Sequence, residues 1–134
     1  MKKVTAIIER GGNGMYSIYV EDTSYPYGII GTGKTVSQAM DDFQAGYREM
    51  KEYVESVGES FVPADFSFKY DVPSFLQEFA FAFSLAGLER ITGVNQKQLG
   101  HYISGYRHPS RRTVQKIESA IHDFSKQLLT VRFL

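Results

Sequence analysis

The chain has 134 residues, enough for one medium domain or two small ones, and its hydrophobic content of 43% is that of a globular protein. The absence of cysteine excludes disulfides, thiolate chemistry and cysteine-based zinc sites. With neither a signal peptide nor an apolar run of ~18 residues, the sequence predicts a cytoplasmic protein without membrane association. The net charge of zero conceals an asymmetry, because residues 1–70 carry seven Lys or Arg against ten Asp or Glu, and residues 71–134 carry eight against five.

Strand-like segments dominate the beginning of the chain. Val4–Arg10 and Met15–Val20 are rich in β-branched and aromatic residues, and the sequence Gly-Gly-Asn-Gly at 11–14 separates them. These four residues accept positive φ angles, so the pattern predicts a β-hairpin. A third strand is predicted over Tyr27–Thr32.

A long helix is predicted to begin at Thr35, which forms a capping box with Gln38, and to end near Gly58. Its apolar residues recur at alternating spacings of four and three, as one face of a helix requires. They are Val36, Met40, Phe43, Tyr47, Met50, Val54 and Val57. The aromatic segment Phe61–Tyr70 is predicted to return as a fourth strand, which gives the order β-β-β-α-β.

Two catalytic interpretations are considered for this half. Gly28–Thr35 fits the phosphate-loop pattern G-x-x-x-x-G-K-T, but no buried strand ends before Gly28 and no later apolar run ends in an Asp suited to magnesium. The carboxylates are expected at solvated helix and turn positions, and the histidines share no metal-ligand spacing. We therefore expect no enzyme activity, no cofactor, no metal and no catalytic residue.

The stretch from Leu85 to Ile121 has the pattern of a helix-turn-helix. A first helix ends at Gly93, whose positive φ lets two helices meet at a steep angle, and a second helix over Gln96–Ser104 ends at Gly105. A third helix opens at Ser110. The residues expected to face the small core are Leu88, Val94, Leu99 and Tyr102.

The outer side of this segment is polar and basic. Within residues 84–112 the only acid is Glu89, as a surface that meets a phosphate backbone requires. Side chains of the second helix can hydrogen-bond base edges, and arginines after it can contact phosphate. The predicted DNA-binding residues are Asn95, which also caps the helix, Gln96, Lys97, Gln98, His101, Arg107, Arg111 and Arg112.

The segment resembles the helix-turn-helix of the Cro/repressor type, and the resemblance implies binding to double-stranded operator DNA. It extends to the downstream pattern Gly105, Pro109, Ser110, Thr113, Ile117, Ala120 and Ile121. Two residues depart from the pattern. Glu89 stands where an Ala is usual, which suggests a slightly opened helix pair, and Gly100 lies inside the second helix, where it lowers helix stability or permits close approach to a phosphate.

The first half resembles the HicB antitoxins of type II toxin–antitoxin pairs, in the hairpin sequence Gly14–Ser17 and in the helix entry Gly33, Thr35 and Ala39. The usual Pro-Asp-x-Pro-Gly turn is replaced by residues 21–26. The resemblance implies an α+β chain with three parts. These are a toxin-binding domain over 1–70, like a pared-down ribonuclease H fold, a connecting segment over 71–83, and an all-α helix-turn-helix domain over 84–134.

The apolar positions of the last helix continue beyond what a helix-turn-helix core needs. Phe124, Leu128, Val131 and Phe133 therefore favour a homodimer or higher homo-oligomer, the alternative being packing onto the first domain. The expected function is an antitoxin that neutralises a HicA-like, RNA-cleaving toxin and represses its own operon. The alternative is a stand-alone transcriptional repressor whose first domain senses a ligand or dimerises.

Overall fold

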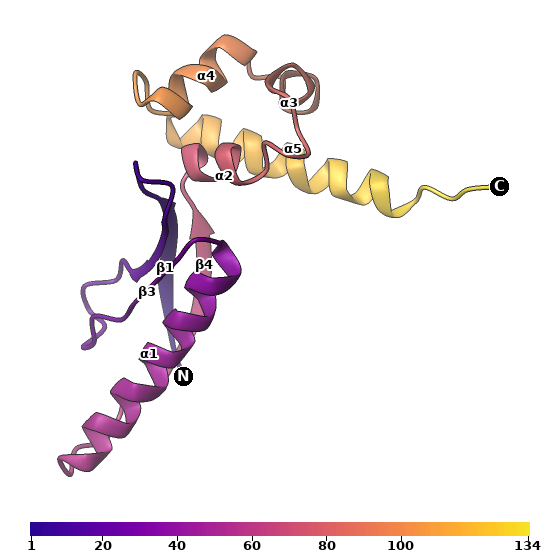
Figure 1. Cartoon of the computed structure of the whole chain (residues 1–134). Helices are drawn as coiled ribbons and strands as arrows, with labels where there is room; N and C mark the ends of the chain where they lie inside the picture. The colour runs from indigo at the N-terminus through magenta and orange to yellow at the C-terminus, as the bar shows by residue number, and fades with distance from the viewer. The chain divides into compact units, whose positions relative to one another are not determined.

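The computed structural model describes residues 1–134 and has an α+β architecture, with one four-stranded mixed sheet and five helices (Figure 1). The chain divides into two compact units, Met1–Ser74 and Phe75–Leu134. The sheet and the longest helix belong to the first unit, and the second unit is helical. None of the helices is both long and apolar enough to cross a membrane.

The sheet has the strand order β3-β2-β1-β4. Its strands are β1 (Lys2–Arg10), β2 (Tyr16–Val20), β3 (Ile30–Gly33) and β4 (Ala64–Tyr70). The strands β1, β2 and β3 pair antiparallel in succession, as a hairpin and a meander require, whereas β4 lies parallel to β1. The predicted hairpin is confirmed, with Gly14 at a φ of 80° in its turn.

The third strand is shorter than predicted, because it begins at Ile30 and not at Tyr27. Tyr25 and Tyr27, which precede this strand, form hydrogen bonds with the segment before β4 instead. The hydroxyl of Tyr25 donates to the carbonyl of Val62 (2.8 Å), and the hydroxyl of Tyr27 accepts from the amide of the same residue (2.9 Å). These aromatic residues therefore fix the segment that leads into β4, and they add no residues to the sheet.

The predicted long helix is α1 (Val36–Ser56). The hydroxyl of Thr35 accepts from the amide of Gln38 (3.1 Å), as the capping box predicts, while the Gln38 side chain accepts from the amide of Lys34 (3.0 Å). The apolar face of the helix lies against β2 and β3, with Phe43 fully buried. Gly58, at a φ of 81°, follows the end of the helix.

The glycines of the phosphate-loop pattern have a packing role. A Cβ atom on Gly31 would overlap the backbone of Ala39 and Phe43, and one on Gly33 would lie 2.6 Å from the Cβ of Gln38. Helix α1 therefore rests directly on β3, at a separation that a side chain does not permit. Since these residues form a strand under a helix, the pattern has a structural explanation.

Aromatic rings fill the space between α1 and the sheet. The ring of Phe43 meets those of Phe66 and Phe68 edge-on, at centroid distances of 4.9 and 5.5 Å. The hydroxyl of Tyr47 accepts from the amide of Ala64 (3.1 Å), so this ring also satisfies a backbone group at the start of β4. Such edge-to-face pairs add to the free energy that the buried area itself contributes.

The segment 71–83, which we expected to be a connection, contains helix α2 (Val72–Glu78). The carboxylate of Asp71 accepts from the amide of Ser74 (2.9 Å), which satisfies one of the free amides of the first turn. The hydroxyl of Ser74 accepts from the amide of Arg10 at the end of β1 (2.8 Å). This hydrogen bond ties the start of α2 to the sheet of the first unit.

Candidate nucleic-acid interface

Three helices follow in the second unit: α3 (Leu85–Thr92), α4 (Gln96–Ser104) and α5 (Arg111–Leu129). Ser84 caps α3, because its hydroxyl accepts from the amide of Gly87 (2.9 Å). Gly93 ends this helix at a φ of 75°, and Gly105 ends α4 at 79°. The helix bounds and the two left-handed stops agree with the sequence prediction.

The predicted core positions are buried. They are Leu88, Val94, Leu99 and Tyr102, joined by Ile117 of α5. A buried polar residue that sequence reasoning missed, Thr92, fixes the turn between α3 and α4. Its hydroxyl donates to the carbonyl of Leu88 (2.7 Å) and accepts from the amide of Val94 (3.1 Å). Both hydrogen-bonding capacities of the hydroxyl are therefore used inside the turn.

Two side chains satisfy the first amides of α4. The Asn95 side chain accepts from the amide of Lys97 (2.8 Å), as its capping position predicts. The carboxylate of Glu89 reaches across the turn from α3 and accepts from the amide of Gln96 (2.8 Å). The unusual acid in the first helix is therefore a second cap for the helix that follows it.

Among the predicted DNA-binding residues of α4 and its cap, those at the start of the helix are the exposed ones. Asn95, Gln96 and Lys97 are exposed, whereas Gln98 and His101 are half-buried. The Gln98 amide donates to the hydroxyl of Tyr102 (3.3 Å), so this side chain turns partly toward the core. Of the side chains predicted to contact bases, Gln96 and Lys97 are therefore the two that lie next to each other on the solvent-exposed surface.

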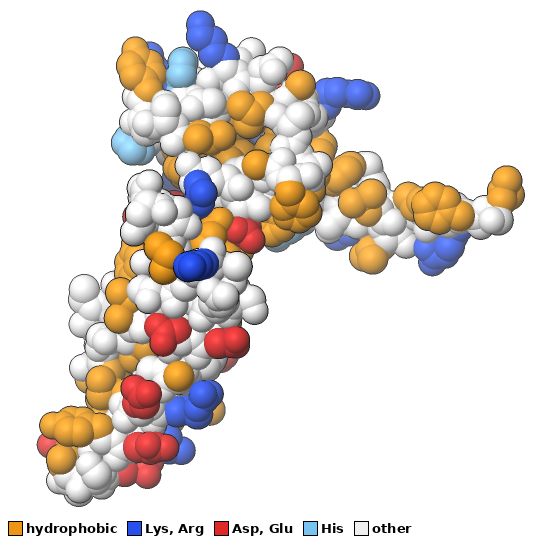
Figure 2. Space-filling view, viewed as in Figure 1, with side chains coloured by type: hydrophobic (Ala, Val, Ile, Leu, Met, Phe, Trp, Pro, Cys, Tyr) orange, Lys and Arg blue, Asp and Glu red, His pale blue; other side chains and the backbone are white.

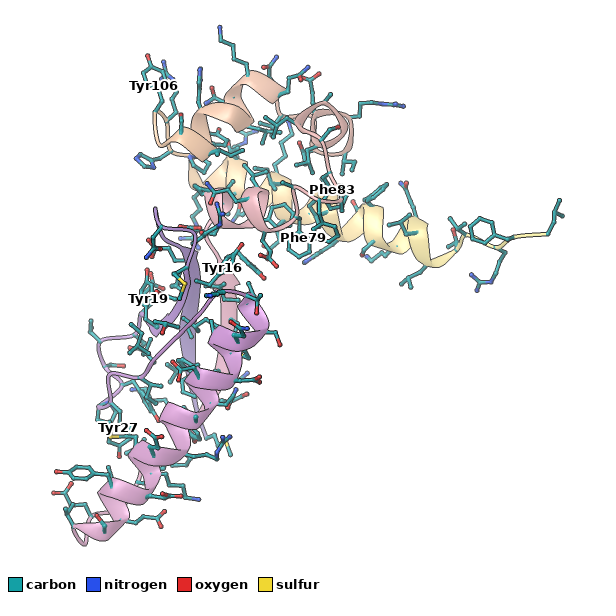
Figure 3. All side chains as sticks on the ribbon, in the orientation of Figure 1. Tyr16, Tyr19, Tyr27, Phe79, Phe83 and Tyr106 are labelled. Atoms are coloured by element: carbon teal, nitrogen blue, oxygen red, sulfur yellow. The ribbon has the colours of Figure 1, made fainter.

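An aromatic residue that the sequence analysis did not select organises the loop after α4. Tyr106 is exposed at the tip of this loop (Figure 3), and its ring meets the ring of His101 edge-on, with centroids 4.9 Å apart. The guanidinium carbon of Arg107 lies 5.5 Å from the centroid of the Tyr106 ring. The buried Nδ1 atom of His101 has no hydrogen-bond partner within the protein. His101 is therefore half-buried against the loop through its ring contact with Tyr106, and its contact with DNA stays a prediction.

Two arginines open α5. Ser110 is the cap, its hydroxyl accepting from the amide of Thr113 (3.2 Å), and Arg111 and Arg112 are the first helical residues. Both are exposed, the first turn contains no acid, and neither arginine forms an ion pair. Because the N-terminus of a helix carries partial positive charge, two cations there are unfavourable in the free protein. A bound anion such as phosphate would remove this penalty.

The electrostatic balance of the second unit agrees with this reading. Residues 75–134 carry eight Lys or Arg against four Asp or Glu, whereas residues 1–74 carry seven against eleven. Acidic side chains are spread along α1 in the first unit (Figure 2). The two units therefore carry opposite charge, and the basic one contains α4.

The sheet offers a second exposed surface, on the side opposite α1. Ile7, Tyr19 and Ile30 are paired across β1, β2 and β3, and the side chain of Ile30 is 59% exposed. The hydroxyl of Tyr19 donates to the carboxylate of Glu9 (2.8 Å), and this hydrogen bond raises the pKa of Tyr19 to about 12. These three side chains, which we call the apolar row, have no covering element in the first unit. No group of three or more His, Asp or Glu residues is arranged to hold a metal ion.

No protein-family model, no curated protein and no solved structure matches the chain.

Proposed function

We propose that this protein is a DNA-binding repressor that also acts as the antitoxin of a HicB-type pair. The second unit is the DNA-binding part, with α3, the Gly93 turn and α4 as its helix-turn-helix. The first unit is the part that binds a toxin. No catalytic role is assigned to either unit.

The observation that carries the proposal is the uncompensated positive charge at the start of α5, in the same unit as the exposed polar start of α4. Arg111 and Arg112 lie at the positive end of α5 without an acid in the first turn and without an ion pair. Gln96 and Lys97 are exposed at the start of α4, whose first amides are already satisfied by protein side chains. An exposed polar helix start can read base edges in a DNA major groove, and unpaired arginines in the same unit can contact the phosphates.

In the proposed complex α4 enters the major groove by its first turn. Gln96 hydrogen-bonds a base edge, and the next residue, Lys97, contacts a base or a phosphate. Arg107, Arg111 and Arg112 contact phosphate and fix the orientation of the helix. Replacing Gln96 with Ala is expected to relax sequence preference at one base pair by about 1–3 kcal/mol if the contact is bidentate.

The first unit supports a role in binding a protein. Its strand order β3-β2-β1-β4, with β4 parallel to β1 and one helix over the sheet, fits a pared-down ribonuclease H-like domain. Its excess of acidic residues suits a basic partner, such as a small RNA-cleaving toxin of the HicA type. The apolar row, in which Ile30 is exposed and Ile7 and Tyr19 are half-buried, offers a surface that such a partner would cover.

Co-expression of the full chain with the small reading frame next to its own tests the antitoxin assignment. A tag on this chain is expected to recover a stoichiometric complex, and the neighbour expressed alone is expected to arrest growth. The variant Ile30→Asp is expected to lose the complex without unfolding. Val57→Asp is the matched control, because Val57 is similarly exposed (53%) but lies beyond the end of α1. If no complex forms and the neighbour is not toxic, the alternative function, a stand-alone repressor, would be favoured.

A further inference from the structure

The second unit contains a groove between α3 and α5, with a volume of about 580 Å³. Its apolar lining comes from Ile91 on α3 and from Ala120 and Phe124 on α5. Two charged residues, Arg90 and Asp123, also line it, and neither forms an ion pair. The groove therefore combines apolar surface with unpaired charges of both signs.

The end of α5 presents the complementary surface. Every residue from Ser125 to Leu134 is exposed, and the apolar side chains of Leu128 and Phe133 are 56% and 93% exposed. Leu128 follows Phe124 by four residues, so both lie on the same face of α5. The apolar stripe of this helix therefore begins in the groove and continues onto its exposed end, where Figure 2 shows hydrophobic side chains at the surface.

We propose that the occupant of the groove is the α5 end of a second copy of this chain. A two-fold axis would place Leu128 and Phe133 of each protomer in the groove of the other. This single operation covers the exposed apolar end of α5 and the groove in both protomers. Because α5 is helical through Leu129, Leu128 stays one turn beyond Phe124 and cannot enter its own groove. Arg132, beside Phe133, supplies a positive charge for the unpaired Asp123 of the other protomer.

This inference deepens the proposed function, since it names the surface that joins the two DNA-binding units a palindromic operator needs. It is tested without DNA and without the toxin. A failure of the dimer experiment is therefore distinguishable from a failure of DNA binding or of toxin capture.

Cross-linking between two labelled populations is the decisive experiment, and the natural chain contributes no cysteine background. Full-length tagged Ala120→Cys is mixed with untagged Phe133→Cys, allowed to exchange and oxidised. A disulfide-linked heterodimer of tagged and untagged chains is expected. Absence of this species, or an internal cross-link in a monomeric chain carrying both substitutions, would overturn the proposal.

A pair of charge insertions on α5 gives a second readout by light scattering after gel filtration. Leu128→Asp is expected to weaken the dimer by about a hundredfold or more, because the symmetry removes two buried leucines at once. Leu129→Asp is the matched control, because Leu129 is 75% exposed but lies about 100° further round the helix. A dimer that resists Leu128→Asp, or a wild-type chain that is monomeric, would contradict the assigned surface.

Discussion

The carboxylate of Glu89 on α3 accepts a hydrogen bond of 2.8 Å from the backbone amide of Gln96, the first residue of α4. The bond joins the two helices across their turn and fixes the end of α4 that carries the exposed polar side chains. A residue that departs from the Cro/repressor pattern therefore has a defined structural use. It holds the start of the helix proposed to read DNA.

Glu89→Ala is expected to lower the free energy of unfolding by about 1 kcal/mol, because the Gln96 amide loses its acceptor. Glu89→Gln retains a side-chain oxygen and is expected to recover most of that loss. Urea unfolding of the three proteins measures the difference. Equal stabilities for wild type and Glu89→Ala would show that the cap contributes nothing.

Gly100→Ala is expected to stabilise the protein by up to about 1 kcal/mol, because alanine favours a helix interior and the added methyl group meets ordinary contact distance. The nearest atom to that methyl is Cδ1 of Leu85, at 3.8 Å. DNA affinity is expected to stay unchanged, since the methyl group faces α3. Gly93→Ala serves as the contrast and should destabilise by about 1–2 kcal/mol, because its φ is 75°. A loss of DNA affinity in Gly100→Ala would instead support close approach of a phosphate there.

Gly31→Ala is expected to unfold the first unit, because the new Cβ would overlap the backbone of α1. Gly28→Ala, at the other end of the phosphate-loop pattern, has open space around its Cα and is expected to be tolerated. Circular dichroism during heating distinguishes the two variants. The packing explanation also predicts no change of melting temperature when ATP and magnesium are added to the wild type. A clear stabilisation by the nucleotide would contradict it.

The raised pKa values of two tyrosines, Tyr19 and Tyr25, predict that the protein loses stability at high pH. The hydrogen bond to Glu9 raises the pKa of Tyr19 from 10 to about 12, and burial raises that of Tyr25 to about 12. The folded state holds these protons more tightly than the unfolded chain. The contribution of these two protonated tyrosines to the free energy of unfolding is therefore complete below pH 10 and is lost as the pH rises toward 12.

Urea unfolding at a series of pH values from 8 to about 12 measures this loss. Tyr25→Phe is expected to be less stable at pH 8, because the hydrogen bond to Val62 is gone, and to lose less stability at alkaline pH. Tyr19→Phe should also reduce the loss of unfolding free energy between pH 10 and about 12. If both variants lose as much stability over this range as the wild type, other groups control the loss.

Much of the fold follows from local patterns in the sequence. The hairpin, the length of α1 and the bounds of α4 were predictable because glycine stops, caps and apolar spacing act within a few residues. Helix α2 was missed, although Asp71 followed by Ser74 three residues later is a capping signal in a segment that otherwise resembles a connection. The late start of β3 could not be predicted, because it depends on Tyr25 and Tyr27 binding Val62, more than thirty residues away.

The candidate interface was predictable by residue type and less so by orientation. Spacing indicated which positions of α4 avoid the core, and Gln96 and Lys97 are exposed as expected. The partial burial of Gln98 and His101 depends on Tyr102 and Tyr106, contacts that a helical pattern does not contain. Likewise, the hydrogen bond from the Gln96 amide to Glu89 depends on the geometry of the turn, so the sequence alone does not identify this acid as a cap.

The most direct test of the account is the salt dependence of DNA binding by the full chain. Fluorescence anisotropy would follow a labelled duplex from the region upstream of its own coding sequence, between about 50 and 200 mM salt. We expect tight binding that weakens steeply with salt and a slope reduced by about one unit in Arg111→Ala. Arg48→Ala, an exposed arginine on α1, should behave as wild type. Binding that does not respond to salt, or an Arg111→Ala slope equal to that of wild type, would contradict the proposed interface.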